Sequence, residues 1–127
     1  MTRGQQTIFI VDRDSALRDS LKFALETEGF IVHVCRTGDD LKAHPFLTCG
    51  QCAVVEHMPP RVDGLAIVAD LKSRGRDLPV ILVTDRVTPQ LRDTAKAAGV
   101  RHIVEKPLID GSLNDHLTAI LRNNQTT

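Results

Sequence analysis

The chain has 127 residues, 42% of them hydrophobic, which is enough for one domain with a real core. Sixteen basic residues balance sixteen acidic ones, and Trp and Tyr are absent, so the chain lacks the basic, aromatic-rich surface that binds nucleic acid. No apolar stretch is long enough to cross a bilayer, and residues 1–6 lack the apolar segment of a signal peptide. We therefore expect a cytoplasmic protein that binds neither nucleic acid nor membrane.

The first predicted strand covers residues 7–11, and an amphipathic helix follows it. The apolar face of this helix contains Leu17, Leu21, Ala24 and Leu25. Gly29 provides the C-terminal stop, and residues 31–35 form the second strand. Thr37 then caps a short helix that buries Leu41.

Residues 52–55 form the third predicted strand, and Asp63 caps the helix that follows. That helix buries Ile67, Val68 and Leu71. Residues 80–83 form the fourth strand, and Thr88 with Pro89 opens a helix that ends at Gly99. Its apolar residues are Leu91, Ala95 and Ala98.

Residues 102–104 form the fifth predicted strand, and Ser112 with Asp115 resembles the capping box of a last helix. The apolar residues of this helix are Leu113, Leu117, Ile120 and Leu121. Strands rich in Val and Ile thus alternate with helices, which is typical of a parallel sheet with crossover helices. The sequence predicts one α/β domain.

Four polar residues follow buried runs in this pattern: Asp12, Glu56, Thr84 and Lys106. In open parallel sheets, ligands bind outside the carboxyl ends of the strands, where the strand order reverses. We therefore expect these four residues to lie together at a functional site.

The motifs around them are Val11-Asp12-Arg13-Asp14, Val55-Glu56 with Pro60 and Gly64 downstream, Val83-Thr84 and Glu105-Lys106-Pro107. In this order they closely resemble the receiver domain of bacterial two-component response regulators, most of all receivers of nitrogen-fixation-type DNA-binding regulators. The resemblance covers about residues 7–122. It implies a flavodoxin-like, doubly wound (βα)5 fold with parallel strand order 2-1-3-4-5. We expect residues 1–127 to be a single receiver domain without an output domain.

The resemblance also implies roles for individual residues. In the family, a histidine kinase transfers a phosphoryl group to an aspartate after the third strand, and an acidic pair after the first strand holds Mg²⁺. Asp12 matches the first acid of that pair, and Thr84 and Lys106 match the residues that contact the phosphoryl group. Lys106-Pro107 matches a peptide that is often cis and aims the lysine inward. If Mg²⁺ binds, its ligands are expected to include Asp12 and the backbone of Met58.

The chain departs from the family pattern at the acceptor itself. Glu56 occupies the phosphoacceptor position and is one methylene longer than aspartate, whereas Mg²⁺ tolerates little displacement of its ligands. Arg13 stands where the family has the second carboxylate, and Asp14 could replace that carboxylate but is better placed to cap the first helix. Asp85 stands where the family prefers a small residue at the gate of the site, and Ile103 replaces the aromatic switch.

The charges of Asp12 and Glu56 are balanced by those of Arg13 and Lys106, so the site has little electrostatic reason to recruit a divalent cation. We expect Glu56 to pair with Lys106, and Arg13 to pair with Asp12 or Asp85. No cofactor is expected, and Mg²⁺ is a doubtful ligand.

These residues favour a receiver that acts by protein interaction, with a sensor histidine kinase or another signalling protein as partner, and not as an enzyme. A homodimer through about residues 88–122 is expected from the family. Three alternatives stay open: a conventional phosphorelay receiver, the receiver part of a longer DNA-binding regulator, and a domain held active because Glu56 resembles a phosphorylated aspartate. A flavin or nucleotide binder is disfavoured because no glycine-rich loop follows residues 7–11.

The cysteines offer a further motif, Cys49-Gly50-Gln51-Cys52, with the spacing of a redox pair or half a zinc site. Further ligands of such a site could be His33, Cys35 and His44. Because this motif enters a strand instead of opening a helix, we expect two small residues without redox or metal chemistry. By the family resemblance, His57 is expected to be a solvent-facing loop residue without a functional role.

Overall fold

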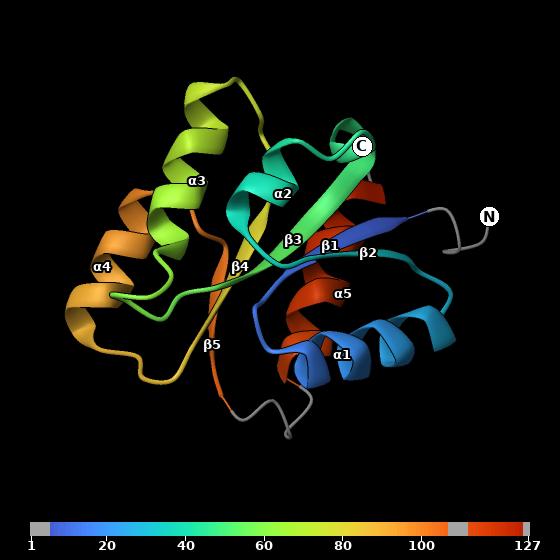
Figure 1. The fold of residues 1–127 in the computed structure, drawn as a ribbon, viewed down its shortest axis with the longest axis horizontal. Coiled ribbons are helices and arrows are strands. Elements are labelled where there is room, and N and C mark those ends of the chain that lie inside the picture. Colours follow the sequence, from blue (N-terminus) through green and yellow to red (C-terminus); the bar gives the residue numbers. More distant parts are fainter. Residues whose placement is uncertain (1–5, 107–111, 126–127) are drawn as a thin grey trace.

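Five parallel strands form one sheet in the order β2-β1-β3-β4-β5, flanked by helices (Figure 1). The computed structural model describes residues 6–106 and 112–125. The strands are β1 (Thr7–Val11), β2 (Ile31–Cys35), β3 (Gly50–Glu56), β4 (Val80–Thr84) and β5 (His102–Glu105). The helices are α1 (Ser15–Thr27), α2 (Gly38–Lys42), α3 (Gly64–Ser73), α4 (Pro89–Ala97) and α5 (Ser112–Gln125). The expected flavodoxin-like (βα)5 fold and its strand order are confirmed.

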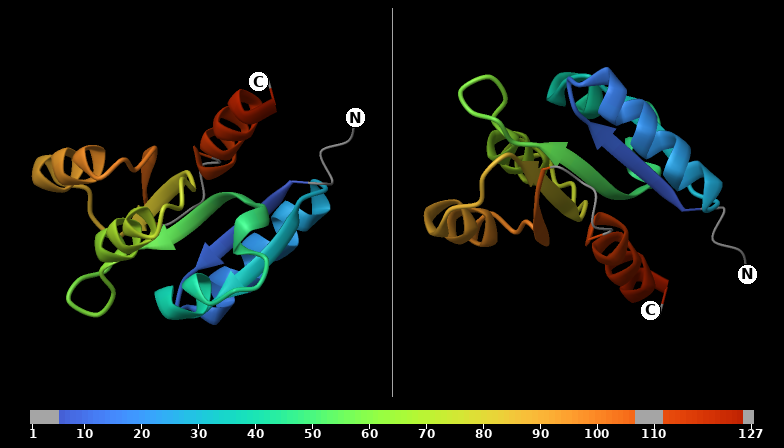
Figure 2. Two further views of the ribbon diagram at one scale, coloured as in Figure 1. Left: turned by 90° about the horizontal axis from the view of Figure 1, so that it is seen from above. Right: turned by 90° about the horizontal axis from the view of Figure 1, so that it is seen from below.

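The helices cover both faces of the sheet, α1 and α5 on one face and α2, α3 and α4 on the other (Figures 1 and 2). Successive side chains of a strand point to opposite faces, so Ile8 and Ile10 pack under α1 and α5 while Phe9 and Val11 pack under the other helices. Burial on both faces explains why β1 and β4 are continuous apolar runs.

The caps expected for the described helices are present. Asp14, Thr37, Asp63 and Thr88 each accept a hydrogen bond from a backbone amide in the first turn of the helix that follows. Gly99, which follows the C-terminal cap of α4, adopts φ 89°, a conformation that favours glycine. The cap expected from Ser112 lies outside the side chains that are described.

Three details differ from the expectation. β3 begins at Gly50, because Gly50 pairs with Thr7 of β1, and it continues through Glu56, which pairs with Val83 of β4. A short 3₁₀ helix, Leu47–Cys49, precedes β3 and was not expected. Ala24 is exposed, because α1 packs on the sheet through Leu21 and Leu25 instead.

In residues 6–106 and 112–125, none of the helices combines the length and apolar character needed to span a membrane.

Candidate functional site

The four polar residues singled out from the sequence come together at the carboxyl edge of the sheet. Asp12 directly follows β1, Glu56 ends β3, Thr84 ends β4, and Lys106 directly follows β5. Asp12, Glu56 and Thr84 are only 4%, 6% and 5% exposed, although each is polar. Buried polar side chains need partners, so their contacts define the chemistry of the site.

Lys106 lies between two buried carboxylates. Its Nζ is 3.4 Å from Asp12 Oδ2 and 3.4 Å from Glu56 Oε2, so the pair expected between Glu56 and Lys106 is present. Burial disfavours the ammonium, but the combined attraction of Asp12 and Glu56 outweighs burial and raises the pKa of Lys106. Burial raises the pKa of the Asp12 carboxyl, although the Asp14 amide and Lys106 oppose this effect. Lys106 therefore stays charged at neutral pH.

The second oxygen of Glu56 faces the loop between β1 and α1. Glu56 Oε1 accepts a hydrogen bond from the Arg13 amide at 3.3 Å, and Arg13 Nε lies 4.0 Å from the same oxygen. The expectation that Arg13 pairs with Asp12 or Asp85 is wrong. The Asp12 oxygens are already bound by the Asp14 amide, at 2.9 Å, and by Lys106. Asp85 is exposed and forms no ion pair within the described part of the chain.

Two further residues hold the loop between β1 and α1 in place. Asp14 Oδ1 accepts hydrogen bonds from the Ala16 and Leu17 amides, at 3.0 and 3.2 Å, which makes Asp14 the cap of α1. Arg18 Nη1 donates to the Asp12 carbonyl oxygen at 3.2 Å. Sequence reasoning missed Arg18, whose only signal is its position one helical turn after the cap. The loop is thus fixed independently of any ligand.

His57 is buried, with 7% exposure, so the expectation of a solvent-facing residue is wrong. Its amide donates to the Val83 carbonyl at 2.8 Å, which continues the pairing of β3 with β4 beyond Glu56. Its Nδ1 accepts a hydrogen bond from the Gly64 amide at 3.0 Å. Burial lowers the pKa of His57, although Asp63 opposes this effect, and a neutral imidazole is what an accepting Nδ1 requires.

Gly64 lets α3 approach this position closely. A Cβ at Gly64 would lie 2.6 Å from the Glu56 carbonyl oxygen and 3.2 Å from His57 Cβ. Neither contact leaves room for a larger side chain, so this glycine is required for the close approach of α3 to the end of β3.

The donors at this edge do not fit Mg²⁺. The Met58 carbonyl, an expected ligand, already accepts hydrogen bonds from the Arg61 and Val62 amides, at 3.0 and 3.1 Å. Asp12 and Glu56 are both bound to Lys106, and the residue next to Asp12 is the cationic Arg13. In the described residues, no three side chains of metal-binding type converge. Mg²⁺ needs near-octahedral oxygen ligands, which this arrangement does not offer.

The remaining candidates lie around this centre. Thr84 and Asp85 line a cavity of about 400 Å³ between the loops that follow β3 and β4. The Thr84 carbonyl accepts a hydrogen bond from the Lys106 amide at 2.8 Å, which fixes the backbone at Lys106. Ile103 is half-buried and packs against the core under α3 and α4. Pro107, and with it the peptide expected to be cis, lies outside the described residues.

The cysteines take no part in this site. All three are free thiols, with Cys35 and Cys52 buried and Cys49 exposed. Burial raises the pKa of Cys52 to about 12 and that of Cys35 to about 11, which disfavours the reactive thiolate. His33 and His44, considered as further ligands, pack with their ring centroids 4.7 Å apart in a cluster with Phe9 and Phe46.

Comparison with known proteins agrees with this geometry. Residues 8–118 match the model of the response regulator receiver domain. The chain is 31% identical over 115 residues to the response regulator MprA of Mycolicibacterium vanbaalenii and, over the same length, to that of Mycobacterium avium. Each match covers 91% of the chain and 50% of the relative, so the chain spans about half the length of these curated relatives.

Solved structures share the fold at lower sequence identity. A two-component response regulator from Clostridium difficile has a TM-score of 0.83 and 23% identity, with 93% of this chain and 97% of that one covered. The non-phosphorylated HemR receiver domain from Leptospira biflexa has a TM-score of 0.82 and 20% identity, with 91% and 94% covered. On the strength of the family match, the chain belongs to the response regulator receiver domain family.

Proposed function

We propose that this domain transmits state in a two-component pathway by docking to a sensor histidine kinase or another signalling protein in the cytoplasm, without being phosphorylated and without acting as an enzyme. The observation that carries this proposal is the position of Lys106 between Asp12 and Glu56. One lysine bridges the two carboxylates that a phosphorylated receiver would use for metal and phosphate, and Arg13 lies beside Glu56.

Phosphoryl transfer needs a free carboxylate oxygen as nucleophile and a cation that neutralises the developing charge. Glu56 is only 6% exposed, and its two oxygens are engaged by Lys106 and by the Arg13 amide. The charges of Asp12, Glu56, Arg13 and Lys106 sum to zero, so the site attracts a divalent cation weakly. Both requirements for phosphorylation are therefore poorly met.

The test is incubation with acetyl phosphate and Mg²⁺, followed by intact-mass measurement, together with a beryllofluoride titration. Wild type is compared with Glu56→Asp, Arg13→Asp and the double variant. We expect no gain of a phosphoryl group in the wild type. If beryllofluoride binds to Glu56→Asp but not to the wild type, the length of the acceptor side chain is what prevents binding. If it binds only to the double variant, Arg13 prevents binding as well. A Mg²⁺-dependent mass gain on wild-type Glu56 would restore the conventional phosphorelay and refute the proposal.

A second candidate is the receiver part of a longer DNA-binding regulator, of the nitrogen-fixation type suggested by the sequence resemblance. The curated relatives favour it, because they are about twice as long as the segment that matches. The native reading frame decides this question: a helix-turn-helix pattern encoded after Thr127 would favour it.

In either context, Glu56 bound to Lys106 can also hold an active-like form, in which case Glu56→Gln weakens binding to the downstream partner.

A further inference from the structure

A cavity of about 230 Å³ opens beside Glu56, on the side away from Lys106 and Thr84. Three arginines line it: Arg13 from the loop after β1, Arg36 from the loop after β2, and Arg61 from the loop after β3. These strands are neighbours in the order β2-β1-β3, and their carboxyl ends share one edge of the sheet. The fold therefore brings three arginines that are far apart in the sequence to one cavity.

Each carboxylate that lines the same cavity has a partner of its own. Asp39 lies 3.2 Å from Lys42, and Asp63 accepts a hydrogen bond from the Ala66 amide at 3.1 Å. Glu56 is bound by Lys106, which lies outside the cavity. By contrast, the guanidinium groups of Arg36 and Arg61 have neither an ion pair nor a hydrogen bond within residues 6–106 and 112–125. The cavity is lined by four basic side chains and three acidic ones, so its net charge is positive, and two of its guanidinium groups lack a partner within the described residues.

We propose that this cavity binds a small phosphate-bearing anion non-covalently. Guanidinium groups match phosphate oxygens with paired, charge-assisted hydrogen bonds, and Arg serves this purpose better than Lys. The volume lies below the range of about 300 to 1,000 Å³ that drug-sized ligands occupy, which favours orthophosphate or a small phosphomonoester over a dinucleotide. Arg13 also contacts Glu56, so Arg36 and Arg61 carry most of the attraction for the anion.

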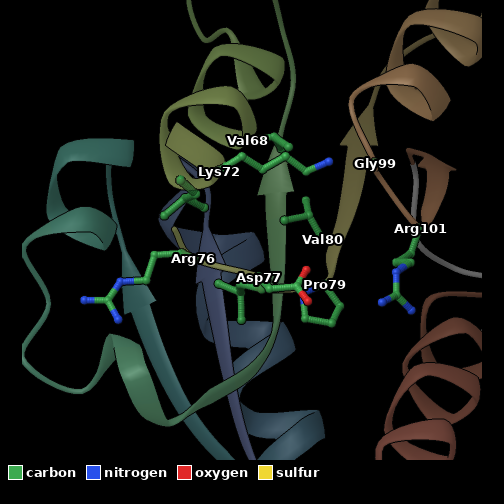
Figure 3. Close-up of a pocket in the computed structure, with 10 residues that line it drawn as sticks. Val68, Lys72, Arg76, Asp77, Pro79, Val80, Gly99 and Arg101 are labelled. Carbon is green, nitrogen blue, oxygen red and sulfur yellow. The ribbon is translucent and has the colours of Figure 1, made fainter. Parts of the chain in front are cut away.

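A second basic pocket shows that positive charge alone does not make such a site. It lies near the amino end of β4, is lined by Lys72, Arg76 and Arg101, and measures only about 50 Å³. Its two arginines, Arg76 and Arg101, lie on opposite sides of the pocket, and Asp77 lies between them (Figure 3). This smaller pocket, with two arginines in place of three, supplies the control, because replacing both of its arginines removes the same charge as replacing Arg36 and Arg61.

The test is a titration of the full chain with inorganic phosphate at low ionic strength and without Mg²⁺, followed by NMR of the arginine side-chain Nε–Hε groups. We expect saturable shifts at Arg13, Arg36 and Arg61 and a rise in melting temperature that follows the ligand concentration. Arg36→Gln/Arg61→Gln should weaken binding about tenfold or more, whereas Arg76→Gln/Arg101→Gln should change it less than about twofold.

A second titration uses glycerol 3-phosphate. If the protein binds it more tightly than orthophosphate, the ligand is a phosphate ester; if it binds it more weakly, the ligand is free phosphate. Absence of saturable shifts, equal weakening in both double variants, or equal binding of acetate would overturn the proposal. The intact mass should stay unchanged throughout, because no bond forms. The assay uses neither kinase nor phosphodonor, so its failure leaves the proposed function untouched.

Discussion

Lys106 Nζ lies 3.4 Å from Glu56 Oε2, although the two residues are 50 positions apart in the sequence. The same nitrogen lies 3.4 Å from Asp12 Oδ2, so one lysine ties the end of β5 to the ends of β1 and β3. Both carboxylates are almost fully buried, and neither could remain charged there without a cation. The lysine is therefore as much a structural residue as a functional one.

Replacing Lys106 by Met should lower the free energy of unfolding by about 3 kcal/mol near pH 7, because two buried carboxylates would face each other without a cation. Urea unfolding measures the loss. The loss should shrink on acidification, because burial already raises the pKa of Asp12 and protonation removes the repulsion. Adding Glu56→Gln to Lys106→Met should recover part of the stability. Unchanged stability in the single variant would contradict the ion-pair account.

The strands and helices were predictable because their signals are local, whereas the strand order came from the family resemblance. Caps such as Thr37 and Thr88 depend on a few neighbouring residues, and buried parallel strands are continuous apolar runs. The partners in the site depend instead on distances across the sheet. Arg13 was expected beside Asp12 or Asp85, but the Glu56 side chain is long enough to accept a hydrogen bond from the Arg13 amide.

His57 was misassigned for the same reason as Arg13. Its burial follows from the pairing of its amide with the Val83 carbonyl. This contact with β4 cannot be predicted from neighbouring residues in the sequence. Gly64 was recognised as part of a motif, but the reason for it, the close approach of α3 to Glu56 and His57, appears only in three dimensions.

His57 should make the stability of the domain fall on acidification. Because burial lowers its folded-state pKa, its contribution is fully present above the ordinary histidine pKa and is lost as the pH falls through the folded-state value. Protonation of Nδ1 also removes the acceptor of the Gly64 amide. His57→Asn keeps an acceptor but does not titrate, so its unfolding free energy should depend less on pH. The comparison is made near pH 5 and near pH 8, and an identical slope in both proteins would refute this role.

Gly64→Ala should destabilise the domain by about 2 kcal/mol, because the new Cβ meets the backbone oxygen of Glu56 and the side chain of Leu82, at 2.6 and 2.9 Å. Gly75→Ala is the matched control, since nothing lies within 4 Å of its added Cβ. Its φ of 76° still costs about 1 kcal/mol through backbone strain alone. Thermal or urea unfolding measures both variants. A larger loss at Gly75 would show that steric contact is not what selects glycine at position 64.

One of the three thiols should react quickly in the folded protein. Cys49 is exposed, whereas Cys35 and Cys52 are buried and burial raises the pKa of both thiols. A thiol reagent should therefore modify Cys49 rapidly and the other two only after unfolding. Mass spectrometry of the labelled protein counts and locates the adducts, and Cys49→Ser provides the blank. Rapid labelling of Cys52, or a disulfide between Cys49 and Cys52 in a reducing buffer, would favour the redox interpretation of the motif.

The homodimer expected through about residues 88–122 should weaken as the pH falls. The groove between α4 and α5 contains Arg92, Lys96, Arg101, His102 and His116. The rings of His102 and His116 stack with centroids 4.1 Å apart, and burial together with His116 and Arg101 lowers the pKa of His102. A two-fold interface places this groove on both subunits, so protonation of His102, at a pH below the ordinary histidine pKa, adds like charge on both sides. Light scattering should detect a dimer near pH 7.5 and a shift to monomer near pH 5.5, whereas His102→Gln should stay dimeric at both. A monomer at every concentration near pH 7.5 would exclude the dimer itself.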